Sequence, residues 1–194
     1  MEINKEYQDL INLERGRALD TFAKLESTLC WVLAEVGNLE FKIASTIFYS
    51  NIFFQPRIEI ISAIIESAYG NRFKIFWTST CKILNSLNKQ RNKIVHWHSY
   101  PVYEKNKNSD KKDFENTKFI LIHPIIKGPD DKLSELSSHN IEEFIKKTQY
   151  VTQVLNRFRH CFDKTVPILT KQEIKLFSEN ELKYPPDKND PFKK

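Results

Sequence analysis

Glycine is scarce in this sequence, which contains only four Gly among its 194 residues. So few glycines, together with several long runs of helical periodicity, argue against both a β-sandwich and a Gly-rich phosphate-binding loop. Hydrophobic residues make up 40% of the chain and 14 residues are Phe, so the chain can bury a substantial core. We therefore expect one mainly helical core.

The sequence also lacks a long apolar run and paired cysteines. No run approaches the length of a membrane span, and the first residues lack the apolar core of a signal peptide. The three Cys lie far apart inside apolar helical runs, with no CxxC pair, which is typical of buried, reduced thiols. We expect a soluble, cytoplasmic protein that does not contact a membrane.

Charge and metal-binding patterns are also weak. Thirty Lys and Arg against 25 Asp and Glu give a net charge of +5, and the basic residues are scattered. This composition permits RNA as a partner without requiring it. There is no acidic cluster for a two-metal nuclease. His96 and His98 have a spacing that zinc can use, but no Cys is nearby, so we expect neither a metal nor another cofactor.

Hydrophobic periodicity predicts the helices. Residues 5–49 are interpreted as one long helix or two collinear helices that bend at Gly37. The apolar residues of this segment form a stripe that is wider than the seam of a coiled coil, which favours packing against several neighbours in a bundle. A second helix has Pro56 in its first turn and ends at Gly70, and a third runs from about residue 72 to 95.

The second half of the chain is less regular. Residues 99–124 are expected to form a β-hairpin insertion whose charged tip, 104–117, is mobile. A fourth helix follows Ser137 or Ser138 as its N-cap. We expect residues 1–166 to form the helical domain and 167–194 to form a short helix and a flexible tail.

The end of the third predicted helix carries the most informative residues. At about 100° per residue, Arg91 falls within the apolar stripe, where a cation needs an explanation. Asn92 and His96 are one turn apart on a ridge that also carries Asn88, and they can face each other. Arg91 and His96 diverge by about 140° on a regular helix. Both can address one small ligand only if the helix distorts near Val95 or if a second copy supplies the partner.

The arrangement of Arg91, Asn92 and His96 resembles the signature of the HEPN family, in which an Arg, usually followed by a polar residue, precedes a His. The resemblance extends over residues 15–163 as an order of helices. It implies an antiparallel helical bundle whose two subunits pair so that their motifs form one cleft. Many family members are metal-independent RNases, and others are inactive binding modules. HEPN toxins paired with nucleotidyltransferase antitoxins usually carry Tyr two residues after the His, where this chain has His98.

RNA cleavage without a metal needs a base for the 2′-hydroxyl, an acid for the leaving 5′-oxygen and positive charge on the phosphorane. His96 suits acid or base work near neutral pH, and Arg91 suits the charge because its planar fork can grip two phosphate oxygens. Asn92 would orient His96 or the phosphate. A symmetric dimer would supply one His as base and one as acid, and His98 is a second candidate.

Each of these residues also has a purely structural interpretation. His96 and His98 suit the end of a helix, where the macrodipole favours a cation. Arg91 would then pair with a carboxylate such as Glu35 or Glu40 across the bundle.

The aromatic residues beside the motif have two interpretations as well. Trp97 and Tyr100 are placed either to stack on RNA bases or to cover the end of the bundle.

We therefore predict an all-α, HEPN-like antiparallel bundle of four to five helices with a small β-hairpin insertion after the third long helix. The expected function is that of a homodimeric, metal-independent endoribonuclease of toxin or defence type, with an antitoxin or regulatory protein as a further partner. The alternative is an inactive dimeric module that binds a nucleotide or a partner protein. The predicted catalytic residues are Arg91, Asn92 and His96, and the predicted substrate-binding residues are His98, Trp97, Tyr100 and Asn88.

Overall fold

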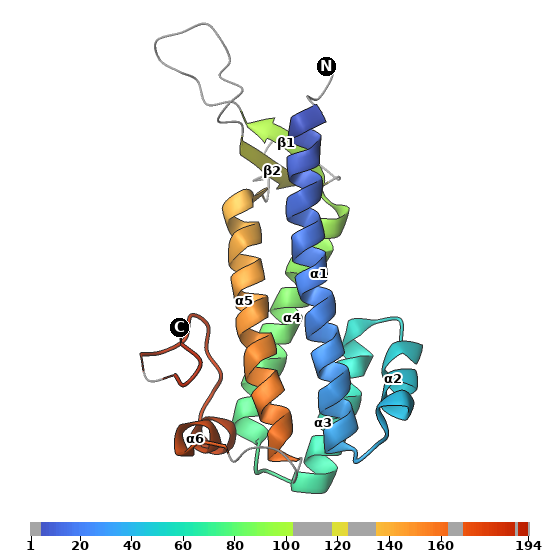
Figure 1. Cartoon of the computed structure of the whole chain (residues 1–194), viewed down its shortest axis with the longest axis vertical. Coiled ribbons are helices and arrows are strands. Elements are labelled where there is room, and N and C mark those ends of the chain that lie inside the picture. Colours follow the sequence, from blue (N-terminus) through green and yellow to red (C-terminus); the bar gives the residue numbers. More distant parts are fainter. Residues whose placement is uncertain (1–4, 103–117, 124–134, 163–168, 189, 194) are drawn as a thin grey trace, which may run out of the picture. The chain divides into compact units, whose positions relative to one another are not determined.

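The computed structural model describes residues 5–102, 118–123, 135–162, 169–188 and 190–193. This part of the chain is mainly helical, with six α-helices and a small three-stranded antiparallel sheet (Figure 1). The chain divides into two compact units, each built from two stretches of sequence: residues 1–22 with 89–146 form the first unit, and 23–88 with 147–194 form the second. Three long helices contribute residues to both units, and the predicted boundary at residue 166 stays a prediction.

These three helices supply the frame of the first unit. They are α1 (Lys5–Val36), α4 (Lys74–His96) and α5 (Ser138–Phe158). The first unit contains the beginning of α1, the end of α4 and the beginning of α5. None of the helices in the described ranges combines the length and apolarity that crossing a bilayer requires.

The sheet of the first unit follows directly after α4. Its strands are β1 (His98–Val102), β2 (Lys118–Ile122) and β3 (Glu135–Ser137), in that spatial order. β1 and β2 are antiparallel, with His98 opposite Ile122. The predicted mobile tip at 104–117 lies outside the described residues. The sequence did not predict β3, because three residues are too few to show an alternating pattern.

Helix α5 begins with a reciprocal cap. The Ser137 hydroxyl accepts a hydrogen bond from the Asn140 backbone N–H at 3.3 Å, and Asn140 Oδ1 accepts from the Ser137 backbone N–H at 2.8 Å. Such an exchange satisfies donors that a helix start leaves without intrahelical partners. Of the two predicted caps, Ser137 is therefore the one used.

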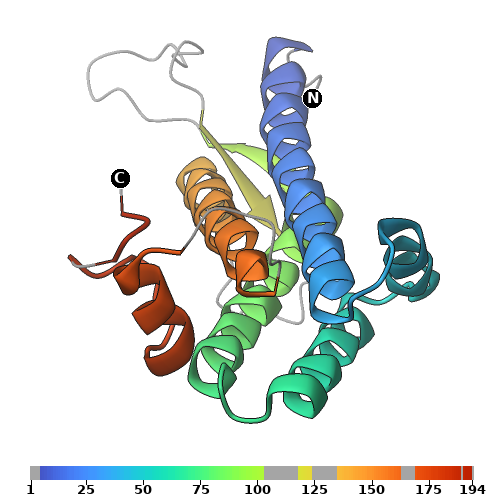
Figure 2. The ribbon, with the colours of Figure 1, turned by 60° about the horizontal axis from the view of Figure 1, so that its bottom comes forward.

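The second unit holds a dense aromatic core. The elements that belong wholly to it are α2 (Phe41–Ser50), α3 (Phe54–Tyr69), the short 3-10 helix η2 (Arg159–Cys161) and α6 (Lys171–Glu179). Phe158 of α5 lies at its centre, with its ring centroid 4.8 Å from that of Phe76 and 5.4 Å from that of Phe177. These contacts pack α6 against the beginning of α4, and Figure 2 shows the two helices side by side.

The first long helical segment is broken and turned back on itself. Asn38 has a positive φ of 49°, Leu39 N–H donates to Ala34 O at 2.8 Å, and Asn38 N–H donates to Glu35 O at 3.2 Å. This is the Schellman pattern that ends a helix. The ring centroids of Trp31 and Phe41 are only 4.0 Å apart, whereas ten residues of straight helix would span about 15 Å. The bend at Gly37 was predicted correctly, but the expectation of two collinear helices was wrong.

The C-terminal segment is docked rather than loose. Leu182 and Phe192 are 3% and 7% exposed, and the Tyr150 hydroxyl donates to Asp190 Oδ2 at 2.6 Å. Leu182 N–H also donates to Ser79 Oγ at 2.8 Å. The expectation of a flexible tail was based on its prolines and charges. Leu182 and Phe192 are nevertheless buried, although their spacing in the sequence shows no regular pattern.

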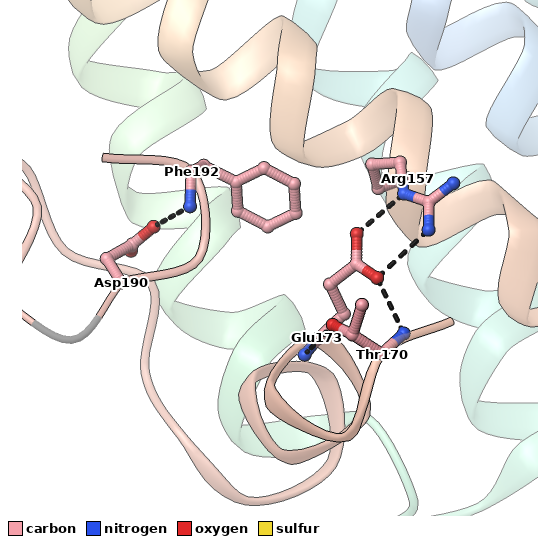
Figure 3. A network of polar contacts seen from close by, with 5 residues as sticks. All are labelled: Arg157, Thr170, Glu173, Asp190 and Phe192. Atoms are coloured by element: carbon pink, nitrogen blue, oxygen red, sulfur yellow. Dashed lines mark hydrogen bonds and ion pairs between the residues drawn. The ribbon is translucent and has the colours of Figure 1, made fainter. Parts of the chain in front are cut away.

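A partly buried ion pair ties α6 to α5. Arg157 Nε and Nη2 donate to the two carboxylate oxygens of Glu173 at 2.6 and 2.9 Å, and Thr170 N–H donates to Glu173 Oε2 at 2.8 Å (Figure 3). The Thr170 hydroxyl in turn accepts from Glu173 N–H, which completes a capping box. The bond with Arg157 is the main reason that the pKa of Glu173 falls to about 2.

Candidate functional site

The candidate site is built on the last turns of α4, which stay regular. Trp97 N–H donates to Lys93 O at 2.9 Å, so the helical bonding pattern continues past Val95. Ile94 is fully buried and fixes the rotation of this helix end. The distortion that would have let Arg91 and His96 meet within one chain is therefore absent from these described turns, and the two side chains diverge by about 140°.

Arg91 is half-buried and is held by uncharged partners. Its guanidinium carbon lies 6.0 Å from the ring centroid of Phe22 in α1, and its Nη1 donates to Asn92 Oδ1 at 3.1 Å. Of the described carboxylates in the same unit, none forms an ion pair with Arg91. A cation over an aromatic ring is stabilised by about 0.5–1 kcal/mol at an exposed site, which leaves its charge largely uncompensated. Arg91 therefore retains the capacity to bind an anion.

Asn92 and His96 are both exposed on the helix surface. Asn92 uses its carbonyl oxygen to hold Arg91, a role that differs from the expected one of orienting His96 or a phosphate. Its amide nitrogen remains a donor for a ligand, and His96 lies one turn further along the same helix face. Asn88 is half-buried in α4 but belongs to the second unit, so the structure does not group it with the motif.

Trp97 covers the end of the first unit. It is only 7% exposed, its ring meets that of His123 edge-on at 5.7 Å, and Lys93 Nζ lies 4.8 Å from the ring centroid. An RNA base has no room to stack on a ring that is buried to this extent. Trp97 therefore packs in the interior at this end of the unit. The expectation that Trp97 binds substrate fails for this reason.

His98 and Tyr100 remain accessible on β1. Both are exposed, Tyr100 by 49%, and they stand two residues apart on the strand. Side chains at this spacing project from the same face of a sheet. They form a polar and aromatic surface that begins two residues after His96, which suits contact with a nucleotide strand.

Arg15 is a residue of the site that sequence reasoning missed. Its Nη2 donates to the backbone carbonyl of Trp97, just beyond the C-terminus of α4, while its Nε is buried and has no hydrogen-bond partner. Burial lowers the pKa of Arg15. A cation at this end of a helix is favoured by the macrodipole. Arg15 therefore takes the helix-capping role that had been considered for His96 and His98.

Metal and thiol chemistry have no visible support in the described ranges. No three His, Cys, Asp or Glu side chains there come together as metal ligands. The three cysteines are free, and burial raises the pKa of Cys81 to about 11 and that of Cys161 to about 12. Thiols of this kind stay protonated near neutral pH and are poor nucleophiles.

Three comparisons with known proteins were made for the whole chain. No family model, no curated protein and no solved structure matches it. The residues at the end of α4 and the surfaces around them are therefore the basis for assigning a function.

Proposed function

We propose that the protein is a metal-independent endoribonuclease of toxin or defence type, with an HEPN-like helical bundle, a hairpin insertion and a homodimeric active site. The observation that carries the proposal is the state of Arg91: a half-buried guanidinium, held in place by Asn92 and Phe22 without a carboxylate partner in its unit. Phosphodiester cleavage requires a cation that is free to bind the phosphate and an accessible imidazole, and Arg91 and the exposed His96 supply one of each per chain.

The regular helix end makes a second copy necessary. Because Arg91 and His96 diverge by about 140° within one chain, one small anion cannot touch both. A two-fold axis passing near the end of α4 would bring the motifs of two protomers together in one cleft. This single cleft would then contain two Arg91 and two His96 side chains.

In the proposed reaction, one His96 removes the proton from the 2′-hydroxyl as its oxygen forms a bond to phosphorus. The partner's His96 donates a proton to the 5′-oxygen as the P–O5′ bond breaks, which leaves a 2′,3′-cyclic phosphate and a 5′-hydroxyl. Arg91 binds the nonbridging oxygens and stabilises the added negative charge. Asn92 positions Arg91, and His98 and Tyr100 contact the neighbouring nucleotide.

The test is a cleavage assay on a mixed RNA pool in excess chelator. Wild-type protein should produce 2′,3′-cyclic phosphate ends, whereas His96→Ala should abolish cleavage with the dimer intact. His139→Ala is the matched control, because His139 is another exposed histidine at a helix end in the same unit. Full cleavage by His96→Ala would show that the catalytic assignment is wrong.

A different outcome would favour the second candidate. If the wild-type protein dimerises but cuts no RNA in the pool, the same cleft would serve as a binding module for a nucleotide or a partner protein. Such a module would bind its ligand through the exposed side chains of His98 and Tyr100, which take no part in the proposed chemistry.

A further inference from the structure

The second unit contains a polar groove that is separate from the motif residues. It has a volume of about 800 Å³ and lies between the part of α1 that follows residue 23 and the end of α5 with η2. Small-molecule sites commonly have volumes of about 300–1,000 Å³. The residues that matter for its chemistry are Lys24, Ser27, Trp31, Glu35, Asn156 and Arg159.

Arg159 is the central cation of this groove. Its guanidinium carbon lies 5.3 Å from the ring centroid of Trp31, and its Nε is buried without a hydrogen-bond partner. The other arginines that anchor this unit behave differently, since Arg57 pairs with Glu26 and Arg157 with Glu173. A partly desolvated guanidinium with unused donors is stabilised by an anion that accepts its hydrogen bonds.

The groove also offers an aromatic surface. Trp31 is 37% exposed, whereas Trp77 in the same unit is only 5% exposed. Phe41, also 37% exposed, stacks on Trp31 with an angle of 22° between the rings. Phe41 and Arg159 occupy the faces of the Trp31 ring, so only the edge of the ring is open for a base to pack against, beside the guanidinium.

The remaining lining residues supply hydrogen-bonding groups of both kinds. Lys24 adds a second cation from α1, and Ser27 and Asn156 offer a hydroxyl and an amide. Glu35 adds a carboxylate that can accept from a ribose hydroxyl or an exocyclic amine. Two cations and one acid therefore line the groove.

We propose that this groove binds a nucleoside phosphate, either as a free nucleotide or as one nucleotide of a single RNA strand. The phosphate contacts Arg159 and Lys24, the base lies against the edge of Trp31, and Glu35 accepts from the sugar. The proposal uses none of the residues of the cleavage motif, so it stands or falls independently of the RNase assignment.

The experiment is a titration of the full-length protein, followed by Trp fluorescence and by calorimetry. One arm uses AMP, and the other uses a short 2′-O-methyl oligonucleotide, which cannot be cleaved by attack of a 2′-hydroxyl. Stronger binding of AMP would identify a free nucleotide as the ligand, and stronger binding of the oligonucleotide would identify an RNA strand. Failure of both to bind at millimolar concentration would overturn the proposal.

Variants show whether binding occurs in the groove. Arg159→Gln should weaken binding by about ten- to hundred-fold, the usual effect of losing a charge-assisted hydrogen bond. Arg72→Gln is the matched control, because Arg72 is an exposed arginine 5.0 Å from the ring of Phe73 that does not line the groove. Equal weakening by both variants would contradict the proposal.

Two further variants separate this site from the motif and from effects on folding. Arg159→Lys should bind with intermediate affinity, since it keeps the charge but loses the planar fork. The loss of affinity caused by Arg159→Gln should be the same in the Arg91→Ala background as in the wild-type background. If Arg91→Ala loses binding while Arg159→Gln retains it, the ligand occupies the motif and the groove assignment is wrong.

Discussion

Removal of the charge on Glu173 should destabilise the protein at neutral pH. The Glu173 side chain is 8% exposed and makes a bidentate contact with Arg157 as well as a bond to Thr170 N–H. Its pKa of about 2, compared with an ordinary value of 4.5, corresponds to about 3 kcal/mol of stabilisation of the folded state. Glu173→Gln keeps the shape of the side chain and removes the charge, so we expect a loss of about 2–3 kcal/mol at pH 7.

The effect should depend on pH in a defined direction. A carboxyl group whose pKa is lower in the folded state stabilises the fold fully above its unfolded pKa, near 4.5, and loses this contribution as the pH falls toward 2. The difference between wild type and Glu173→Gln should therefore be constant from pH 7 to about 5 and shrink steadily below about pH 4.5.

Urea unfolding followed by circular dichroism at pH 7, 5, 4 and 3 would measure this difference. Glu142→Gln is the control, because Glu142 pairs with Lys146 on an exposed surface and its loss should leave the unfolding free energy unchanged within error. Equal stability of Glu173→Gln and wild type at pH 7 would refute the reasoning. So would a difference that stays the same down to pH 3.

Four other perturbations test the fold. Gly70→Ala should lower the free energy of unfolding by about 1–3 kcal/mol, because Gly70 has a φ of 56° and the added methyl group meets no neighbour, so backbone strain is the cause. Gly16→Ala lies in a helix with open space around it and should raise the free energy of unfolding by up to about 1 kcal/mol. Arg15→Met should cost about 1–2 kcal/mol and alter the near-UV dichroism of Trp97, whose carbonyl loses its donor. Deletion of residues 181–194 should lower the unfolding free energy by about 3–6 kcal/mol, since two buried apolar side chains are lost. Unchanged urea midpoints would contradict each of these expectations.

Local sequence signals were sufficient to locate most helices. The end of α3 follows from Gly70, whose positive φ few other residues adopt, and the beginning of α5 follows from Ser137. The predicted third helix matches α4 to within about two residues at each end. These features depend on residues that are close together in the sequence.

What the sequence did not reveal depends on contacts between distant residues. Asn38 ends α1, but only the stacking of Trp31 on Phe41 shows that α2 turns back. Arg15 and Trp97 are 82 residues apart, and no periodic pattern links them. The burial of Trp97 likewise depends on which segments cover the helix end, so the sequence left its covering and stacking roles equally open.

The most direct test of the proposed shared cleft is cleavage by mixed dimers. Wild-type protein is allowed to exchange subunits with a nine-fold excess of His96→Ala protein, and cleavage of a labelled RNA is measured in chelator. If both imidazoles act in one cleft, only wild-type pairs are active, and the activity per wild-type subunit should fall to about one tenth. Activity per wild-type subunit that is unaffected by the excess of variant would show that each protomer works alone, and a complete absence of cleavage by the wild-type protein would contradict the nuclease itself.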